Sequence, residues 1–383
     1  MPPADSKGLT YNPPMRVTLV GLVACLLLAA CSSPASTTEP TLAASVAAPS
    51  SAPSMAGVES PTPSPSASEL LPAPQWAALE AIGPVPREDH TWTVDASGDV
   101  AYLFGGRDRE ATSGDLWAYD LATDAWSEIT FEGGPAPRFG HEAVWVAGTG
   151  LVIFAGQADA TTFFNDLWAY DPGSVSWRQL PSTGAFPVAR YGTCAAVGPD
   201  GRLWISHGFT SENARFNDTR AYDLETGVWT DETPEAPLPV SRCLHGCWWT
   251  DGGELALFGG QTTGATALGD LWLLSDGAWT HIEGNLPSAR NLYARARLAS
   301  GVTLVFGGQA LDETFLADAF LLNDGEANAV AVEPGGPAPA PRAGAEMIVD
   351  EARNRVLLFG GRDADRAYGD LWELRDLGVS LGP

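Results

Sequence analysis

Basic residues are scarce in this chain. Its 383 residues include 21 Lys and Arg against 47 Asp and Glu, which gives a formal net charge of −26 at pH 7. A surface of that sign repels the phosphates of nucleic acids and the headgroups of anionic lipids. We therefore exclude nucleic acid as a partner and expect any membrane association to depend on a covalently attached anchor.

The sequence also lacks the common signatures of catalysis and metal binding. It contains no Gly-x-Ser-x-Gly, no His-Glu-x-x-His and no glycine-rich phosphate loop. Cysteine is rare, and Cys-Leu-His-Gly-Cys at 243–247 offers too few ligands from one strand for a zinc site. His90, His141 and His245 each follow a recurring arginine by three residues, which indicates repeated structure rather than catalysis. We expect no metal, no cofactor and no identifiable catalytic residue.

Long helices are absent as well, because no stretch beyond residue 75 keeps helical periodicity over three turns. The chain has instead a sixfold repeat of three markers, with a period of 48–53 residues. The markers are an arginine after a proline-bearing turn, then a glycine pair or its variant, then an aspartate that usually opens Asp-Leu-Trp. The arginines are Arg87, Arg138, Arg190, Arg242, Arg290 and Arg342; the pairs begin at Gly105, Ala155, His207, Gly259, Gly307 and Gly360; the aspartates are Asp115, Asp166, Asp218, Asp270, Asp318 and Asp370. A unit of about 50 residues indicates the blades of a β-propeller.

Each unit contains four short runs with the length and composition of strands. In the second unit they cover 141–146, 151–154, 166–170 and 177–180, and Gly, Pro, Asp and Asn separate them. We therefore predict an all-β fold, a six-bladed propeller in which each blade is a four-stranded antiparallel sheet. The tryptophans of the third and fourth runs are expected to pack between adjacent sheets. The glycine pairs are expected where a Cβ would obstruct neighbouring backbone.

This pattern resembles the kelch repeat, as found in kelch and galactose oxidase-like propeller domains. The second unit matches it best, with Arg138, Phe154-Ala-Gly156, Asp166-Leu-Trp168 and Trp177. The resemblance covers residues 76–375. The third unit departs from it at Ile205-Ser-His-Gly208, and the fifth has no tryptophan on the fourth strand after Leu322.

The two ends of the repeat array predict how the ring closes. The last unit stops after Asp370-Leu-Trp-Glu-Leu374 without a fourth-strand tryptophan. Trp76 precedes Arg87 by eleven residues, the same separation as Trp279 from Arg290. Residues 75–80 should therefore supply the missing outer strand of the sixth blade, so that the propeller domain covers residues 75–383.

The first 74 residues have the character of a leader and a linker. The apolar run from Val17 to Ala30 follows Arg16 and has the layout of a secretory signal. Its ending, Leu28-Ala-Ala-Cys31, resembles a bacterial lipoprotein box, which implies a signal peptide at 1–30 and a lipid on Cys31; ordinary signal cleavage nearby is the alternative. Residues 31–74 consist mainly of Ser, Pro, Ala and Thr and should form a disordered stalk. We expect an exported protein, lipid-anchored to the outer side of the bacterial cell membrane.

Three cysteines lie within the repeats: Cys194, Cys243 and Cys247. Relative to the repeat arginine, Cys194 stands at +4 in the third unit and Cys247 at +5 in the fourth. Opposite parity on adjacent innermost strands can place the two side chains on facing sides of one blade interface. A Cys194–Cys247 disulfide is then possible in an exported protein. Three buried free thiols are the alternative.

Candidate ligand-binding residues gather at one end of the strands. The loops into the first strand and out of the second open on the same face, so the residues after the glycine pairs should ring one mouth of the central channel. These are Arg107, Gln157, Phe209, Gln261, Gln309 and Arg362, and the following loops add Phe163, Phe164, Arg215, Phe315 and Tyr368. Arginines, amides and aromatic rings suit carboxylates, hydroxyls and sugar faces. The repeat arginines themselves are interpreted as internal hydrogen-bond donors of each blade.

The sequence thus favours a monomeric, surface-tethered binding module for a glycan or a protein ligand at this mouth. The alternative is a small-molecule enzyme on a kelch propeller, because sialic acid mutarotases are similar single six-bladed domains exported by bacteria. Copper chemistry of the galactose oxidase type is not expected, since its His, Tyr and cross-linked Cys–Tyr ligands have no counterpart in the motifs.

Overall fold

The computed structural model describes residues 73–211, 214–264, 266–379 and 381. The expected signal peptide (1–30), the lipidation site Cys31 and nearly all of the expected linker (31–74) lie outside the described residues. Within the described part of the chain, no helix is long and apolar enough to cross a membrane.

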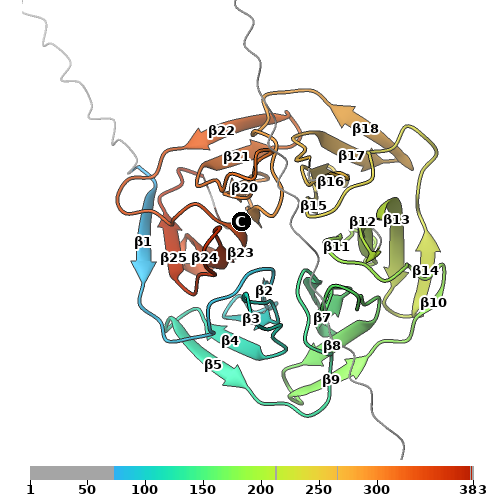
Figure 1. Ribbon diagram of the computed structural model, residues 1–383, viewed down its shortest axis with the longest axis horizontal. Coiled ribbons are helices and arrows are strands. Elements are labelled where there is room, and N and C mark those ends of the chain that lie inside the picture. The colour runs from blue at the N-terminus through green and yellow to red at the C-terminus, as the bar shows by residue number, and fades with distance from the viewer. Residues whose placement is uncertain (1–72, 212–213, 265, 380, 382–383) are drawn as a thin grey trace, which may run out of the picture. The chain divides into compact units, whose positions relative to one another are not determined.

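Six sheets surround a central axis, and in each sheet the strand that follows the repeat arginine is innermost (Figure 1). Blade 1 contains β2 (Thr91–Val94), β3 (Val100–Phe104), β4 (Leu116–Asp120) and β5 (Ala125–Ile129). Blade 2 contains β6 (Glu142–Val146), β7 (Gly150–Phe154), β8 (Leu167–Asp171) and β9 (Ser176–Gln179). Blade 3 contains β11 (Cys194–Val197), β12 (Leu203–Phe209), β13 (Arg215–Asp223) and β14 (Val228–Asp231), and β10 (Thr183–Gly184) pairs in parallel with β14.

The remaining blades follow the same order. Blade 4 contains β15 (Gly246–Trp249), β16 (Leu255–Phe258), β17 (Leu271–Ser275) and β18 (Ala278–Ile282). Blade 5 contains β19 (Ala294–Arg297), β20 (Thr303–Phe306), β21 (Ala319–Asn323) and β22 (Asn328–Val332). Blade 6 contains β23 (Ala343–Asp350), β24 (Arg355–Arg362), β25 (Leu371–Arg375) and β1 (Gln75–Leu79), and the 3₁₀ helix η2 (Glu351–Arg353) lies between β23 and β24. The predicted six-bladed all-β propeller is confirmed.

The ring closes as the sequence predicts. Strand β1 pairs antiparallel with β25 along its whole length, with Trp76 opposite Leu374. The sixth blade therefore combines the first strand of the domain with its last three. No unpaired edge remains at the junction between the two ends of the repeat array.

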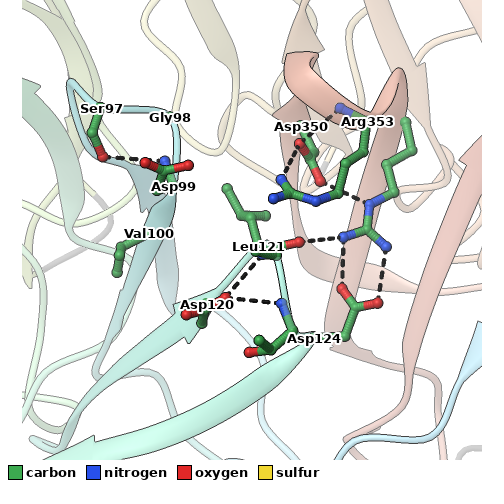
Figure 2. A network of polar contacts seen from close by, with 12 residues as sticks. Ser97, Gly98, Asp99, Val100, Asp120, Leu121, Asp124, Asp350 and Arg353 are labelled. Atoms are coloured by element: carbon green, nitrogen blue, oxygen red, sulfur yellow. Dashed lines mark hydrogen bonds and ion pairs between the residues drawn. The ribbon is translucent and has the colours of Figure 1, made fainter.

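A buried polar network reinforces the junction between blades 6 and 1 (Figure 2). Arg355, at the start of β24, donates to Asp350 Oδ2 at 2.8 Å and to the Leu121 carbonyl of the β4–β5 turn at 2.8 Å. It also donates to both carboxylate oxygens of Asp124 in that turn, at 2.6 and 3.2 Å. Asp350 also accepts from Arg353 at 3.0 Å. Ion pairs between the sheets thus add to the β1–β25 pairing.

Each repeat arginine is the centre of one recurring set of hydrogen bonds. In blade 2, Arg138 Nη1 donates to the Ala155 carbonyl at 2.9 Å, and Nη1 and Nη2 donate to the two carboxylate oxygens of Asp166 at 2.7 and 3.1 Å. Its Nε donates to the Ala136 carbonyl at 3.1 Å. All six repeat arginine side chains are at most 1% exposed. Their structural interpretation is confirmed.

The tryptophans of the third and fourth strands have different roles. A fourth-strand tryptophan packs against the phenylalanine that precedes the glycine pair of the preceding blade, as Trp177 does against Phe104 with ring centroids 5.3 Å apart. Third-strand tryptophans are half-buried and donate Nε1 to the repeat aspartate, as Trp168 does to Asp166 at 2.8 Å. The expectation that both sets fill the space between sheets is therefore correct for the fourth strand, whereas the third-strand indoles mainly orient a carboxylate.

A closed ring of six backbone hydrogen bonds surrounds the axis. The residue two positions after each repeat arginine has a positive φ and donates its amide N–H to the carbonyl of its counterpart in the preceding blade, at 2.8–3.1 Å. Two of the glycines in this backbone ring are required by space: a Cβ would lie 1.9 Å from the Tyr191 ring at Gly140 and 2.6 Å from Leu244 at Gly192. The backbone ring consists of Asp89, Gly140, Gly192, Leu244, Leu292 and Gly344.

The innermost strands of blades 3 and 4 are joined covalently. Cys194 on β11 and Cys247 on β15 form a disulfide with Cα atoms 5.6 Å apart. Cys243 is a buried free thiol. The disulfide therefore links two adjacent blades near the axis, and both of its residues are buried.

Candidate functional site

The residues after the glycine pairs lie together at one end of the channel. Each pairs through its backbone with the residue that follows a repeat arginine, next to the backbone ring: Arg107 with Glu88, Gln157 with Phe139, Phe209 with Tyr191, Gln261 with Cys243, Gln309 with Asn291, and Arg362 with Ala343. Three guanidinium groups at this end cover aromatic rings. We refer to these arginines and rings as the arginine face: Arg107 over Phe139 at 4.0 Å, Arg215 over Phe209 at 5.2 Å and Arg362 over Phe315 at 5.2 Å.

Two of the three arginines share one carboxylate. Arg107 Nε contacts Glu88 Oε1 at 3.1 Å, and Arg362 Nε contacts Glu88 Oε2 at 2.5 Å. Arg107 Nη2 also contacts Asp89 Oδ2 at 3.2 Å, and that oxygen accepts from the Tyr191 hydroxyl at 3.2 Å. The side chains of Arg107 and Arg362 remain about a third exposed, at 32 and 27%. The carboxylates of Glu88 and Asp89 thus fix the two guanidinium groups, and the exposed part of each arginine can still contact a ligand.

Glu88 gives this site a titratable group near neutral pH. Burial, and then the adjacent Asp89 carboxylate, raise the pKa of Glu88 to about 7 against the opposing effect of Arg107 and Arg362. Burial also raises the pKa of Tyr191 far above its usual range, so its hydroxyl stays a hydrogen-bond donor. Protonation of Glu88 would remove the negative charge that partly neutralises Arg107 and Arg362, and both arginines would then attract an anion more strongly.

Arg215 is held without a carboxylate. Its Nε and Nη1 are buried and have no oxygen acceptor among the described residues, and the polar group beside the guanidinium is the Cys243 thiol. Its guanidinium lies over Phe209, whose ring packs edge-on against Phe163 with centroids 5.8 Å apart. A buried donor without an acceptor is costly. Arg215 is therefore the arginine of this face with the greatest unmet capacity for an anionic ligand.

The other predicted ligand-binding residues lie at the same end but are engaged within the domain. Gln157 Nε2 donates to the Asp159 carbonyl at 2.6 Å, and Gln309 Nε2 donates to the Glu313 carbonyl at 3.3 Å. Gln261 Nε2 lies 4.0 Å from Cys243 Sγ. These amides mainly fix the shape of the loops around the mouth.

Two predicted aromatic residues stack on repeat arginines instead of facing a ligand. Phe164 covers Arg138 at 4.1 Å, and Tyr368 covers Arg342 at 4.2 Å. Tyr368 is 6% exposed, and its hydroxyl donates to Asp363 Oδ2 at 2.5 Å. We therefore leave both residues out of the arginine face.

Sequence reasoning missed Glu88, Asp89, Phe139 and Tyr191, which complete this end of the channel. They stand one or two positions after the repeat arginines. In the other blades the first of these positions holds Cys243, Asn291 and Ala343. That freedom of residue type, next to an invariant arginine, is the signal that could have pointed to them.

The opposite end of the channel opens into a larger cavity, of about 1000 Å³. Three charged side chains from innermost strands lie where this cavity meets a smaller void of about 60 Å³ beside the backbone ring: Glu142, Arg295 and Glu346. Arg295 Nη2 contacts Glu142 Oε2 at 3.5 Å. Burial raises the pKa of Glu142 to about 7 and that of Glu346 to about 8.

The recurring histidines are buried and uncharged. Burial lowers the pKa values of His90, His141 and His245 far below the usual range, so all three stay neutral. In the described ranges no group of three or more His, Cys, Asp or Glu side chains could hold a metal ion. The chemistry that the two ends offer is therefore charge pairing and hydrogen bonding.

Comparison with known proteins gives the same assignment as the fold. Residues 71–260 and 237–375 match the KLHDC2/KLHL20/DRC7 Kelch-repeats domain. The chain is 27% identical over 232 residues to "Kelch domain-containing protein 3" of Homo sapiens, covering 57% of this chain and 60% of that protein. It is 28% identical over 225 residues to "Kelch domain-containing protein 2" of Bos taurus, covering 52% and 55%.

A third relative carries the name of an enzyme. The chain is 29% identical over 212 residues to "N-(sulfonatooxy)prop-2-enimidothioate sulfolyase" of Thlaspi arvense, covering 49% of this chain and 59% of that protein. The match thus spans between 55 and 60% of the length of these three relatives. With six blades, a buried arginine–aspartate pair in each, and a family match over most of its length, the chain belongs to the kelch-repeat domain family.

Proposed function

We propose that this kelch propeller is an interaction module whose arginine face binds a protein segment that presents carboxylate groups. The observation that carries the proposal is Arg215, whose buried Nε and Nη1 have no oxygen acceptor among the described residues and only the Cys243 thiol beside them. Kelch propellers are in general protein-interaction modules. Three guanidinium groups at one mouth of an otherwise acidic protein favour an acidic partner there.

The geometry of the face supports recognition of more than one acidic group. Each guanidinium is fixed over an aromatic ring, so little side-chain freedom is lost when a ligand binds. Arg107 and Arg362 come from adjacent blades and are linked through Glu88, whereas Arg215 comes from blade 3. A ligand that spans the mouth can pair with both groups of arginines.

The test selects a displayed library of random peptides on the intact chain and on two variants. Arg215→Gln removes the unpaired guanidinium, and Arg178→Gln, on the exposed part of outer strand β9, is the matched control. We expect enriched peptides to contain Asp or Glu, to bind Arg215→Gln roughly tenfold or more weakly, and to bind Arg178→Gln as they bind the wild type. Enrichment without acidic residues, or equal binding to Arg215→Gln, would refute the proposal; acidic glycans that compete with the peptides would widen the ligand class.

An enzymatic role has no specific observation in its favour. The mutarotase alternative and the enzyme name of the Thlaspi relative both remain unsupported by any residue of this chain. A catalytic role would need one position whose removal abolishes turnover, whereas the arginine face predicts graded weakening when single residues change.

We further propose that the propeller is displayed on the outer side of a bacterial membrane by a lipid on Cys31. The support is the Leu28-Ala-Ala-Cys31 sequence after a short apolar run. Mass spectrometry of the mature N-terminal peptide tests this directly. A diacylglyceryl group on Cys31, absent in Cys31→Ala, supports the tether, and an unmodified or retained leader refutes it.

A further inference from the structure

The central channel opens into a cavity at the opposite end from the arginine face. Its floor is formed by Glu142 on β6, Arg295 on β19 and Glu346 on β23, all on innermost strands. The cavity above this floor, of about 1000 Å³, lies in the size range of small-molecule sites in proteins. We propose that this cavity binds a small organic cation that carries a primary ammonium group, with Glu346 as its principal partner.

The repeat does not require charge at these positions. The residue four places after the repeat arginine is Glu142 in blade 2 and Glu346 in blade 6, but it is Gly246 and Ala294 in blades 4 and 5. A blade of this propeller therefore forms equally well with an uncharged residue at this position. Placing two carboxylates close to one another in a channel is costly. Such a departure from local packing preference is expected at a functional site.

The partners of the three groups leave one carboxylate available. Glu142 and Arg295 come from blades 2 and 5, on opposite sides of the ring, and pair across the channel at 3.5 Å. The stem of Arg295 passes the bare backbone of blade 4, since a Cβ on Gly246 would lie 2.8 Å from Arg295 Cδ. Among the described residues, Glu346 makes no ion pair and no side-chain hydrogen bond. Glu142 is thus paired directly with Arg295, whereas Glu346 lines the cavity close to Arg295 but without a direct ion pair.

The walls of the cavity carry the same sign. Asp95 and Asp99 of the β2–β3 turn and Glu351 of η2 line its mouth. Arg297, the remaining arginine of the lining, already pairs with Asp324 at 3.0 Å and Asp251 at 3.1 Å. A cation that enters therefore moves along acidic groups toward Glu346, which is how a charged cleft concentrates a ligand.

Binding of an ammonium group should release a proton near neutral pH. The charged groups that act on Glu346 are Arg295, Glu142 and Asp89, and Arg295 also acts on Glu142. Because the pKa values of both glutamates are raised, the two carboxyl groups are partly protonated at pH 7. The neighbouring His90, His141 and His245 are neutral there and do not contribute. An ammonium ion favours the carboxylates, so affinity should rise as the pH increases from 6 to 8.5, provided that the probe itself stays charged over that range.

The experiment compares two probes of equal length, 1,4-diaminobutane and 1,4-butanediol, by titration calorimetry and thermal shift of the intact chain. Amines of this type stay protonated well above pH 8.5. We expect the diamine to bind at millimolar concentration or below, more tightly at pH 8.5 than at pH 6, with proton release measured from the dependence of the heat on the buffer. The diol should not bind.

Three variants locate the site. Glu346→Gln and Glu142→Gln keep side-chain volume and should weaken diamine binding about tenfold or more and remove the pH dependence. Glu128→Gln, on the exposed outer strand β5, should bind as the wild type does. Equal binding of the diol, absence of diamine binding, or unchanged binding to Glu346→Gln would each overturn the proposal. None of these outcomes bears on the arginine face, because neither Glu346 nor Glu142 belongs to it.

Discussion

Removal of one repeat aspartate tests whether the buried arginines are held mainly by charge. Asp166→Ala deletes the carboxylate acceptors of Arg138 Nη1 and Nη2, at 2.7 and 3.1 Å, and leaves the Ala155 carbonyl as the remaining acceptor of Nη1. The Arg138 side chain is 0% exposed and cannot turn to water, whereas Asp166 is 23% exposed. Breaking a buried pair by removing one partner costs about 3–5 kcal/mol. Because some water can reach the vacated carboxylate site, we expect a value near the lower limit.

Thermal unfolding of the intact chain measures this cost. A loss of about 3 kcal/mol should lower Tm by roughly 5 °C in a domain of this size, and Glu128→Ala on the exposed outer strand should leave Tm within about 1 °C of the wild type. Asp318→Ala should cost less than Asp166→Ala, because Asp318 is 41% exposed.

The double variant Arg138→Met/Asp166→Ala decides the mechanism. Since it removes the unpaired buried cation, it should be less destabilised than the sum of the two single variants by about 1–3 kcal/mol. Additive single effects, or a Tm unchanged by Asp166→Ala, would refute the reasoning that the pair acts as a unit.

Three further predictions follow from the structure. Cys194→Ser/Cys247→Ser should lose about 2–4 kcal/mol of stability, and a strong reductant should lower the Tm of the wild type but not of this variant; equal responses would contradict it. Burial raises the pKa of Glu142 to about 7 and of Glu346 to about 8, so the folded state is stabilised fully at pH values below the usual glutamate pKa, and this contribution is lost as the pH rises through 7–8. Tm should therefore fall between pH 5 and pH 9, and Glu142→Gln/Glu346→Gln should reduce this fall. An equal dependence of Tm on pH in the two proteins would exclude these glutamates as its cause. Trp177→Ala should cost about 3–5 kcal/mol and the half-buried Trp168→Ala clearly less, which chemical denaturation measures; equal losses would show that the third-strand indoles also fill the core.

The fold could be predicted because its markers contact one another at fixed sequence distances. In every blade the repeat arginine bonds the carbonyl at the start of the glycine pair, 17 or 18 residues ahead, and the aspartate 28 residues ahead. Because one blade imposes this geometry on itself, the same spacing recurs six times and is visible in the sequence. Strand β1 was predictable for the same reason, since Trp76 completes the pattern of the sixth blade.

The sites could be predicted only in part, because their contacts join different blades. Glu88 reaches Arg362 across 274 residues, and Arg295 reaches Glu142 across 153. No periodic signal marks such a pair, since the residue type at each of these positions varies from blade to blade. The sequence placed Arg107 and Arg362 at one mouth but could not show that Glu88 links them or that two carboxylates face the channel at the other end.

The pairing of β1 with β25 has a consequence for the order of events during synthesis. Strand β1 leaves the ribosome before any blade exists, and its partner β25 leaves after all the other strands of the domain. At a translation rate of about 5–20 residues per second, many seconds therefore pass between the synthesis of β1 and that of β25, and the hydrogen-bonding edge of β1 stays unpaired during this time. The first five blades can form as they emerge, but the annulus can be shut only when the last sheet is made. A pause or a premature stop late in the message would leave an open-ended array, with an exposed strand at one end and an unfinished sheet at the other.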